Sequence, residues 1–263
     1  MQRRGQVTVF IIAGIVVLAA AVILLLVRST LVKEELAREP TESVLLGAPV
    51  KQYVESCLKQ TAEGAVVYIG QHGGYYELPD VFDPKFSLPY YFYEDDSTFL
   101  TRNDVEEEIS AYIDDMLFFC TRNFVPFREQ GVTIQSEEVS ATTTLFDEKA
   151  RIDVVYPLAI TRGDVSTALS RFSVEVPVRT GTIHDVTGEF LTFQEENPDV
   201  ICISCLVGLA LDNDLRVEMY FVREGEMLFT FVDEKVPVKD EAYTYRFMNK
   251  YVFRSENATE SEQ

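Results

Sequence analysis

The hydrophobic pattern of this 263-residue chain begins with an uninterrupted apolar run from Val7 to Val27, which contains no charged residue. Fifteen of its residues are Val, Ile, Leu or Phe. A helix of this length is about 30 Å long at about 1.5 Å per residue, which matches the hydrocarbon core of a bilayer. A core helix of a soluble domain would carry a polar face, and this run has none. The pattern therefore predicts a transmembrane helix over residues 7–27, with the lipid bilayer as its partner.

The charged residues on either side of this run predict its orientation. Arg3 and Arg4 precede it, whereas Arg28 and Lys33 are followed closely by three glutamates. Basic residues favour the cytoplasmic side, so residues 1–6 are expected to form a short cytoplasmic leader, with everything after residue 27 outside. A cleavable secretory signal fits less well, because the apolar run exceeds the usual ~7–15 residues and no small-residue cleavage site follows Leu26.

The residues before the run carry a second signal. The stretch Arg3-Arg4-Gly5-Gln6-Val7-Thr8 resembles the processing site of type IV pilin-like precursors, especially the archaeal form with a class III signal peptide. The resemblance is confined to the N-terminal residues and implies cleavage between Gly5 and Gln6, with the apolar helix then able to self-associate. The chain departs from the family pattern at Phe10, since many pilins carry Glu at the fifth mature position. An uncleaved anchor is the alternative.

Beyond residue 27, apolar residues recur at helical spacing in several places. Residues 28–39 are expected to extend the first helix as far as Pro40, and residues 41–49 to form a linker. Amphipathic helices are predicted from Val50 to Ile69, ended by glycines, from a cap at Asn103 with acidic residues in the first turn, and over Thr182–Glu196. The apolar positions of the first two are Val50, Val54, Cys57, Leu58, Ala62, Ala65, Val66 and Ile69, and Ile109, Tyr112, Ile113, Met116, Leu117 and Cys120.

After Gly131 the period of the pattern changes from 3.6 to 2, which predicts strands. The alternating segments are Val132–Ile134, Thr142–Phe146, Ala150–Tyr156, Ser173–Val178, Leu215–Phe221, Met227–Val232 and, more weakly, Tyr243–Phe253. Asp147–Lys149 and Arg223–Glu226 are predicted turns, and Pro177 places its strand near an edge. Helices segregated from runs of antiparallel strands indicate an α+β fold for residues 50–254. The polar tail, residues 255–263, is expected to be disordered.

The segment from Tyr75 to Phe99 is rich in Tyr, Phe and Pro but has no period. Its run Pro89–Tyr93 could be a short strand or an exposed aromatic surface for a partner. Aromatic residues between prolines often close the side of a core, so core packing is the favoured interpretation.

Composition and charge narrow the class of protein. The chain is 47 % hydrophobic, enough for a large core, and its formal net charge is −20. Residues 1–28 hold three arginines and no acidic residue, so the remainder carries −23. A surface this acidic repels nucleic acid and anionic lipid headgroups. No nucleophile, phosphate-loop or metal motif occurs, and His72 and His184 are interpreted as a turn residue and an exposed helix residue. The chain is therefore not expected to be an enzyme or to hold a metal or cofactor.

Four cysteines, Cys57, Cys120, Cys202 and Cys205, carry the recognisable chemistry. Outside the cytoplasm an even number of cysteines suggests disulfides. Cys57 and Cys120 lie on the apolar faces of two predicted helices, which makes a Cys57–Cys120 bridge plausible and leaves Cys202 and Cys205 to each other. Three connectivities are possible, and the sequence does not choose among them.

The spacing Cys202-Ile203-Ser204-Cys205 allows three interpretations. A structural bridge or two buried thiols comes first. A redox pair would require the motif at the start of a helix, with an exposed first thiol, and here apolar neighbours favour burial instead. Zinc would need a second pair of ligands at a similar spacing, which the chain lacks.

These observations predict a single-pass, membrane-anchored protein with an acidic, disulfide-bearing domain at the cell surface. Its role is expected to be structural or interactive, in a pilin-like assembly or as an uncleaved binding module with Tyr75–Tyr93 as its contact surface. A membrane-anchored thiol oxidoreductase is the remaining alternative. Asn257 begins a glycosylation sequon on the expected outer side.

Overall fold

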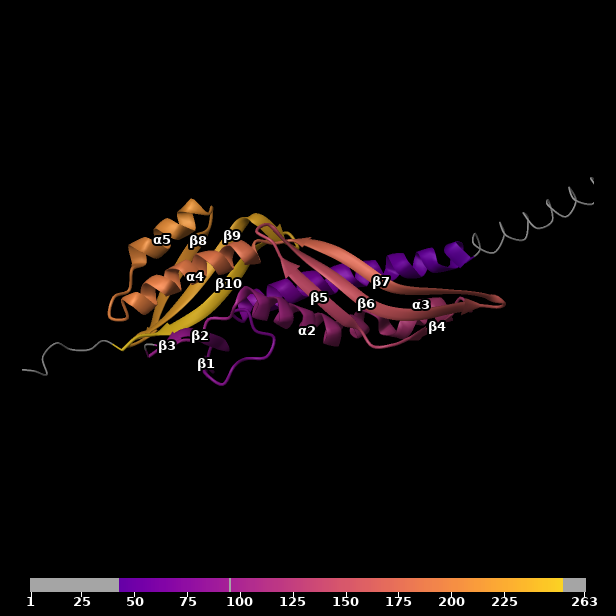
Figure 1. The fold of residues 1–263 in the computed structure, drawn as a ribbon, viewed down its shortest axis with the longest axis horizontal. Coiled ribbons are helices and arrows are strands. Elements are labelled where there is room, and N and C mark those ends of the chain that lie inside the picture. Colours follow the sequence, from indigo (N-terminus) through magenta and orange to yellow (C-terminus); the bar gives the residue numbers. More distant parts are fainter. Residues whose placement is uncertain (1–42, 95, 253–263) are drawn as a thin grey trace, which may run out of the picture.

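The computed structural model describes residues 43–94 and 96–252 and shows an elongated molecule built on two β-sheets (Figure 1). Predictions for the transmembrane helix 7–27, the processing site at Gly5 and Gln6, the tail and Asn257 lie outside the described residues. Residue 43 is at one end of the long axis, whereas helix α5 and strand β8 are at the other end (Figure 1). No helix in the described residues is long and apolar enough to cross a bilayer.

The described part of the first helix covers residues 43–71 and contains every apolar position predicted for Val50–Ile69 on its buried face. The prediction of a linker up to residue 49 is wrong for residues 43–49, which are helical. Proline normally breaks a helix because it removes a hydrogen bond. Here the turn before Pro49 packs on the protein, since Gly47 is buried and lies against Thr167 and Leu169 of strand β7. Tertiary packing outweighs the local preference.

Helix α2 (Arg102–Thr121) lies beside the first helix and is joined to it by the disulfide between Cys57 and Cys120. Its cap is Thr101, not Asn103 as predicted. The Thr101 hydroxyl accepts the N–H of Asp104 while the Asp104 carboxylate accepts the Thr101 N–H, which is a capping box. A 3₁₀ turn, η1 (Arg122–Phe124), and a short helix, α3 (Val125–Arg128), lead on to the first sheet.

The four-stranded antiparallel sheet contains β4 (Thr133–Ser136), β5 (Ser140–Leu145), β6 (Lys149–Arg162) and β7 (Val165–Pro177). Strand β6 is central: β4 and β5 pair with successive parts of one side and β7 with the other. Every second residue of β6 from Ala150 to Ile160 is buried, so one face of this sheet meets the core. The strands predicted here are confirmed, although β6 and β7 are longer than predicted.

Side chains of α2 cover the outer edge of β5. Residues spaced four apart on the helix accept N–H groups spaced two apart on the strand, and these spacings match at about 6 Å and 6.7 Å. The three pairs are Glu106 Oε1 with Leu145 N at 2.7 Å, Ser110 Oγ with Thr143 N at 3.0 Å, and Asp114 Oδ1 with Ala141 N at 2.6 Å. Three outward N–H groups of this edge strand are thereby satisfied within the molecule.

The second sheet has six strands. Its order is β1 (Phe82–Asp83), β2 (Leu88–Tyr93), β10 (Glu241–Lys250), β9 (Glu226–Val238) and β8 (Arg216–Arg223), with β3 (Asp96–Ser97) paired to β2. Only the β2–β10 pair is parallel. Strand β2 is the aromatic run Pro89–Tyr93 and is almost wholly buried, which confirms core packing for that run.

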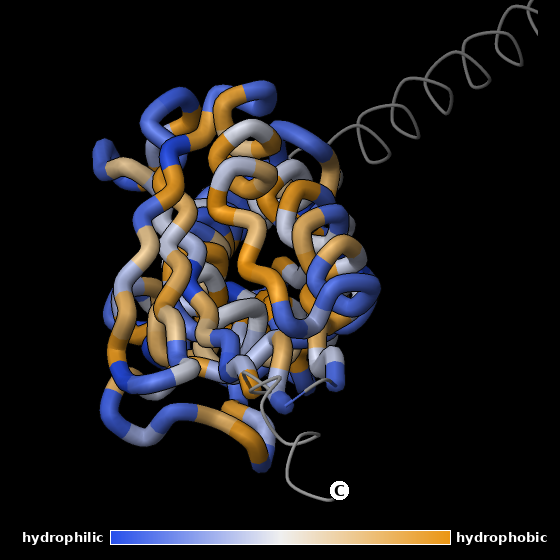
Figure 2. Tube along the Cα trace, turned by 90° about the vertical axis from the view of Figure 1, so that its left-hand side faces the viewer, coloured by the Kyte–Doolittle hydropathy of each residue, from blue (hydrophilic) through white to orange (hydrophobic). Residues whose placement is uncertain are grey.

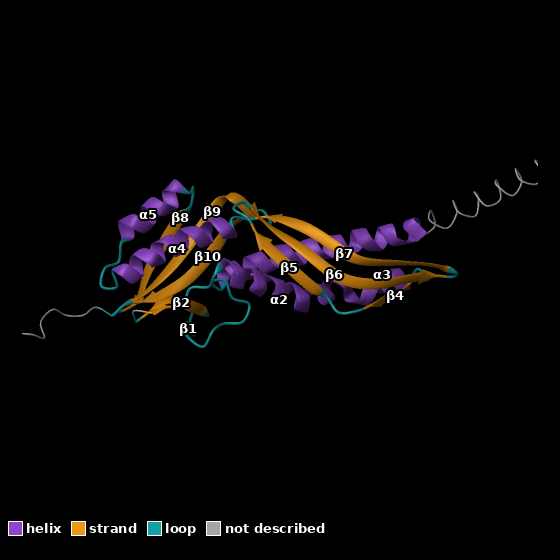
Figure 3. Cartoon of the chain, in the orientation of Figure 1, coloured by secondary structure: helices purple, strands orange, loops and turns teal. Residues whose placement is uncertain are grey.

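Two helices cover one face of this second sheet, α4 (Thr180–Glu196) and α5 (Ile203–Asp212) (Figure 3). The helix predicted over Thr182–Glu196 is confirmed, whereas α5 was not predicted. A large hydrophobic cluster continues from the first helix through both sheets to Leu206 and Ala210 of α5. The described residues therefore form an α+β domain with one main core.

Candidate functional site

The C-x-x-C motif lies at the start of α5, where Cys202 is the N-cap residue and its Sγ accepts the N–H of Cys205 at 3.2 Å. The two cysteines form a disulfide. Both are partly exposed, and Val200 and Ile203 beside them are 53 % and 43 % exposed. The prediction of apolar neighbours that bury the pair is therefore wrong for these two residues, because both point to solvent.

The exposed side of α5 continues the apolar surface. Leu206 and Ala210 hold the helix on the core, while Leu211 on the other side is 68 % exposed. Strand β8 contacts α5 and exposes Tyr220 and Phe221, the latter by 71 %. We call the exposed apolar side chains of Val200, Ile203, Leu211 and Phe221 the α5–β8 face. Tyr220, the neighbour of Phe221 on the strand, points to the opposite side of the sheet. Figure 2 views the molecule onto this end, where hydrophobic and hydrophilic positions lie side by side.

Strand β8 is also one edge of its sheet, and the longer one, since the other edge strand, β1, has only two residues and exposes Phe82 by 37 %. Among the described strands β8 pairs with β9 alone, so its outer N–H and C=O groups remain available to another strand. The β7 edge differs, because none of its large apolar side chains is exposed and its last residue, Pro177, has no N–H. Phe118 and Phe119 of α2 are exposed too, but the strand beside α2 is the covered β5. An open edge and exposed aromatic side chains coincide at β8.

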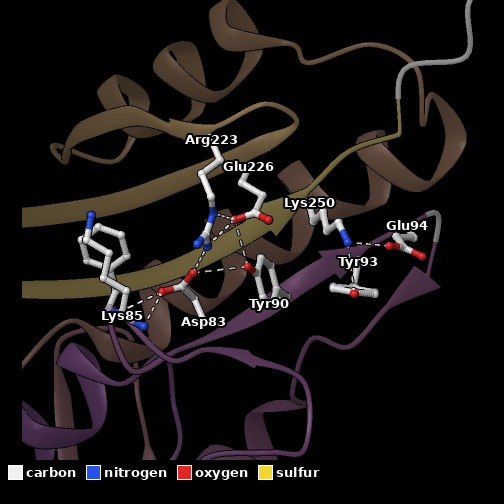
Figure 4. Close-up of polar contacts among 9 residues, drawn as sticks. Asp83, Lys85, Tyr90, Tyr93, Glu94, Arg223, Glu226 and Lys250 are labelled. Atoms are coloured by element: carbon white, nitrogen blue, oxygen red, sulfur yellow. Dashed lines mark hydrogen bonds and ion pairs between the residues drawn. The ribbon is translucent and has the colours of Figure 1, made fainter.

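A network of charged residues fixes the end of β8 (Figure 4). Arg223, the last residue of β8, bonds to the buried carboxylate of Asp83, and its Nε lies 2.7 Å from Glu226 Oε2 at the start of β9. The Tyr90 hydroxyl donates to Glu226 Oε2 at 3.1 Å, and the Phe86 N–H donates to Asp83 Oδ1 at 2.9 Å. The edge strand is therefore held in place two residues after Phe221.

The pKa values in this network follow from its bonds. Burial acts to raise the pKa of Asp83, but the hydrogen bonds from the Phe86 N–H and from Arg223 outweigh it, so this pKa lies below its usual value. Burial and the Glu226 charge raise the pKa of Tyr90 to about 12. At neutral pH Asp83 is therefore ionised and Tyr90 is neutral, as the bonds to Arg223 and Glu226 require.

A hollow of about 630 Å³ lies between the β5–β6 turn and the start of α4. Beneath it the buried Arg179 pairs with Asp233 at 3.2 Å and also bonds to the Asn213 carbonyl, while Asp233 Oδ2 has no hydrogen-bond partner in the described residues. The lining has charges of both signs and no cysteine or histidine: Phe146, Asp147, Glu148, Lys149, Arg179, Thr182, Asp185 and Asn213.

Neither histidine lines the hollow or belongs to the α5–β8 face, although His184 Nδ1 lies 3.7 Å from Oδ1 of Asp185, which lines the hollow. His72 is a turn residue, as predicted, and its Nδ1 lies 2.8 Å from the Tyr68 carbonyl. His184 was predicted to be exposed but is buried, with its ring stacked on Phe99 and Nε2 2.9 Å from the Leu100 carbonyl. Over the described ranges, no group of three or more His, Cys, Asp or Glu residues is placed to hold a metal ion.

Of the three connectivities that the sequence left open, the structure has the one in which Cys57 bonds to Cys120 and Cys202 to Cys205. The structure does not bring the two disulfides together: one lies between the first helix and α2, the other at the far end on α5. The open edge of β8 was missed, and its only sequence signal was the aromatic pair Tyr220-Phe221 at the end of an alternating segment.

No known relative fixes the function. Comparison of the chain with protein-family models, curated proteins and solved structures finds no match. The function must therefore be argued from the sequence and from the geometry of the α5–β8 face.

Proposed function

We propose that this protein is anchored in a membrane by residues 7–27 and displays its α+β domain outside the cytoplasm, where the α5–β8 face binds another protein. The observation that carries the proposal is the position of this face. It lies at the end of the elongated domain opposite residue 43, the end nearest in sequence to the apolar run (Figure 1). A domain anchored through residue 43 would hold the α5–β8 face away from the bilayer.

The chemistry of the face supports a protein as partner. Exposed aromatic and aliphatic side chains beside a free strand edge are the features that bind an extended polypeptide by strand addition. A nucleic acid or an anionic lipid surface is disfavoured by the formal charge of −23 beyond residue 28. A patch of this kind on a soluble domain is expected to be covered in use.

A second candidate function is a subunit of a pilin-like assembly, in which residues 7–27 of neighbouring copies would pack together. Two observations favour it: the stretch Arg3-Arg4-Gly5-Gln6, and an apolar groove of about 500 Å³ near residue 43, lined in part by Leu45, Leu46 and Phe127. A neighbouring copy packed helix on helix would meet this groove. Under this candidate function, Gln6 is the first residue of the mature protein.

Two measurements test these proposals. Protease added to intact cells should remove the described domain if it lies outside, and a domain that stays intact until the cells are lysed would contradict the proposal. Mass spectrometry of the mature N-terminus then separates the two functions. A chain that begins at Gln6 supports the pilin-like route, and a chain that retains Arg3 and Arg4 rejects it.

The binding face is tested with a photo-crosslinking amino acid at single positions of the full chain in cells. A probe in place of Phe221 should form one defined adduct with a second protein. The matched control replaces Phe146, which is 42 % exposed but lies on the β5–β6 turn of the other sheet. Equal adducts from both positions, or none from Phe221, would remove the α5–β8 face as the binding surface.

A further inference from the structure

The Cys202–Cys205 disulfide is partly exposed, and the fold does not need it to hold α5 in place. The bond closes a loop of only four residues, and α5 is held on the core by Leu206 and Ala210 without it. A bond between residues so close in sequence restrains the unfolded chain little. The Cys57–Cys120 bond, by contrast, joins two helices across 63 residues, and Cys57 is only 5 % exposed. The two disulfides therefore differ in structural value, and they differ in burial at Cys57, since Cys120 is partly exposed like Cys202 and Cys205.

The lengths and directions of α5 and β8 place the accessible disulfide near the far end of the β8 edge. Helix α5 and strand β8 run side by side in opposite directions (Figure 1). Helix α5 is about 15 Å long, and β8 runs back along it from Arg216. The strand therefore reaches the level of the start of α5 after about four or five residues. That position is Tyr220 or Phe221. Phe221 lies on the same face of β8 as Val217 and Met219, because alternate residues of a strand share a face. Val217 and Met219 pack on the main core that includes Leu206 of α5.

An extended chain that paired with the β8 edge would therefore run past the disulfide, with apolar side chains of the α5–β8 face on either side. This arrangement supplies the two parts that thiol–disulfide exchange needs: an accessible disulfide, and a surface that binds the reacting chain in an extended form. Strand pairing recognises a backbone and leaves the sequence open, so a cysteine-containing segment of any suitable protein qualifies.

We propose that Cys202 and Cys205 exchange their disulfide with two cysteine thiols of a protein segment bound along the β8 edge. A thiolate of the segment attacks Cys202 Sγ, the Cys202–Cys205 bond breaks, and Cys205 leaves as a thiolate that takes a proton from water. The second thiolate of the segment then attacks its own sulfur in the mixed disulfide and expels Cys202. Two electrons pass from the segment to the cysteine pair, and the segment leaves with a new disulfide.

The start of α5 favours the last step. Cys202 leaves as a thiolate at the N-terminal end of the helix, where the Cys205 N–H already points at its sulfur. Negative charge is stabilised at this end of a helix, and cysteine thiolates are stabilised there in the same way. That the α5–β8 face binds the segment rests on the proposed function, in which this face binds another protein. The chemistry of the exchange does not depend on which side of the membrane the domain occupies.

The exchange is tested on the full chain in detergent with a synthetic extended peptide that carries two cysteine thiols. Oxidised protein and reduced peptide are mixed in equal amounts, quenched with an alkylating reagent and analysed by mass spectrometry. The expected result is an oxidised peptide and two new thiols, both at Cys202 and Cys205, with Cys57 and Cys120 still bonded. Exchange that occurs only in denaturant, or equally at both disulfides, overturns the proposal.

Two matched variants test the order of attack. In Cys205→Ser the peptide, activated as a mixed disulfide with a small thiol, should be captured by Cys202 and should remain bound. In Cys202→Ser the same capture at Cys205 should be at least tenfold slower, because Cys205 is not the N-cap sulfur. Equal capture by both variants contradicts the assignment of Cys202 as the attacked residue.

A third variant separates the binding surface from the cysteine chemistry. Phe221→Ser should slow exchange with the peptide at least threefold and leave exchange with a small dithiol unchanged. If both rates fall together, or if neither changes, the β8 edge does not bind the peptide. Because the assay uses detergent-solubilised protein, a negative result here is distinguishable from a failure of the proposed membrane topology, which the protease experiment on intact cells measures separately.

Discussion

The outer edges of β5 and β8 differ in whether other parts of the molecule cover their backbone groups, although both are edge strands of an antiparallel pair. At β5, three side chains of α2 accept the outward N–H groups, and the disulfide between Cys57 and Cys120 holds α2 on the first helix. At β8, no described strand or side-chain ladder covers the edge, aromatic side chains face solvent, and the nearby disulfide is accessible. The backbone N–H groups at the β5 edge are bonded within the molecule and stabilise the fold. The backbone groups at the β8 edge remain available to bind another chain.

The largest difference is expected from removal of the disulfides. The double change Cys57→Ala and Cys120→Ala should lower the free energy of unfolding by about 4 kcal/mol, because the bond closes a long loop. Cys202→Ala with Cys205→Ala should cost about 2 kcal/mol at most, because its loop is short. Urea unfolding of the full chain in detergent, followed by tyrosine circular dichroism, measures both. Equal losses would show that the two regions depend on their disulfides alike.

The bonds from α2 to β5 should contribute less to the free energy of unfolding than the Cys57–Cys120 disulfide. They should contribute more than any feature of the β8 edge. Glu106→Ala with Ser110→Ala leaves two part-buried N–H groups of β5 without partners, and we expect a loss of about 2 kcal/mol in the same unfolding experiment. The matched control is Arg216→Ala with Glu218→Ala on β8, where solvent-screened ion pairs should contribute much less than the two N–H groups of β5. A control that loses as much as the test variant would remove the distinction.

Asp114 should make a smaller, pH-dependent contribution to the covered edge. Burial raises the pKa of its carboxyl above the usual value, against the opposing effect of the Ala141 N–H. A raised pKa means that the stabilising contribution of this group is complete below about pH 3.9 and is lost as the pH rises through the shifted value. Asp114→Asn keeps an oxygen for the Ala141 N–H and avoids the buried charge. It should therefore be more stable than the wild type at pH 7, by less than about 1 kcal/mol.

The control for this effect is Asp212→Asn, which removes one negative charge from an exposed position on α5. Its stability should keep the pH dependence of the wild type, whereas that of Asp114→Asn should be flatter in the acidic range. If both variants gain stability equally at pH 7, the gain comes from reduced net charge and not from the buried position.

The smallest effect on stability is expected at the open edge itself. Phe221→Ser removes a side chain that is 71 % exposed, so the free energy of unfolding should change by no more than about 0.5 kcal/mol. The same variant is expected to lose crosslinking and peptide exchange. A loss above about 1 kcal/mol would mean that Phe221 belongs to the core and that the comparison of the two edges is wrong.

Elements with a strong period could be predicted from the sequence. The eight apolar positions between Val50 and Ile69 define one helix face, and every second residue of β6 defines one sheet face, so local pattern and tertiary environment agree there. Helix α5 escaped prediction because Ile203–Asp212 is apolar on nearly all sides and has no polar face to reveal a period. The capping box could have been found from Thr101 and Asp104, which have the required spacing.

The candidate site could be predicted only in part. The sequence left three disulfide connectivities open, with Cys202–Cys205 as the remainder of a plausible Cys57–Cys120 bridge. The exposure of Cys202 and Cys205 depends on where α5 rests on the sheet, which is a tertiary property. The difference between the two edges is also tertiary. Nothing in the residues of β5 or β8 shows that Glu106, Ser110 and Asp114 will face one strand while no equivalent side chains face the other. Parallel pairing of β2 with β10 brings together segments that are far apart in the sequence.

The bond between Cys57 and Cys120 has a mechanical consequence for a tethered domain. Tension applied at residue 43, with the far end held by a partner, would first peel the first helix from the protein, one turn after another. Peeling must stop at Cys57, because from there a covalent link passes the force to the last turn of α2. At most the residues from 43 to 56 can extend, at up to about 3.6 Å each. The tether would lengthen by a limited amount under load while the rest of the domain kept its fold.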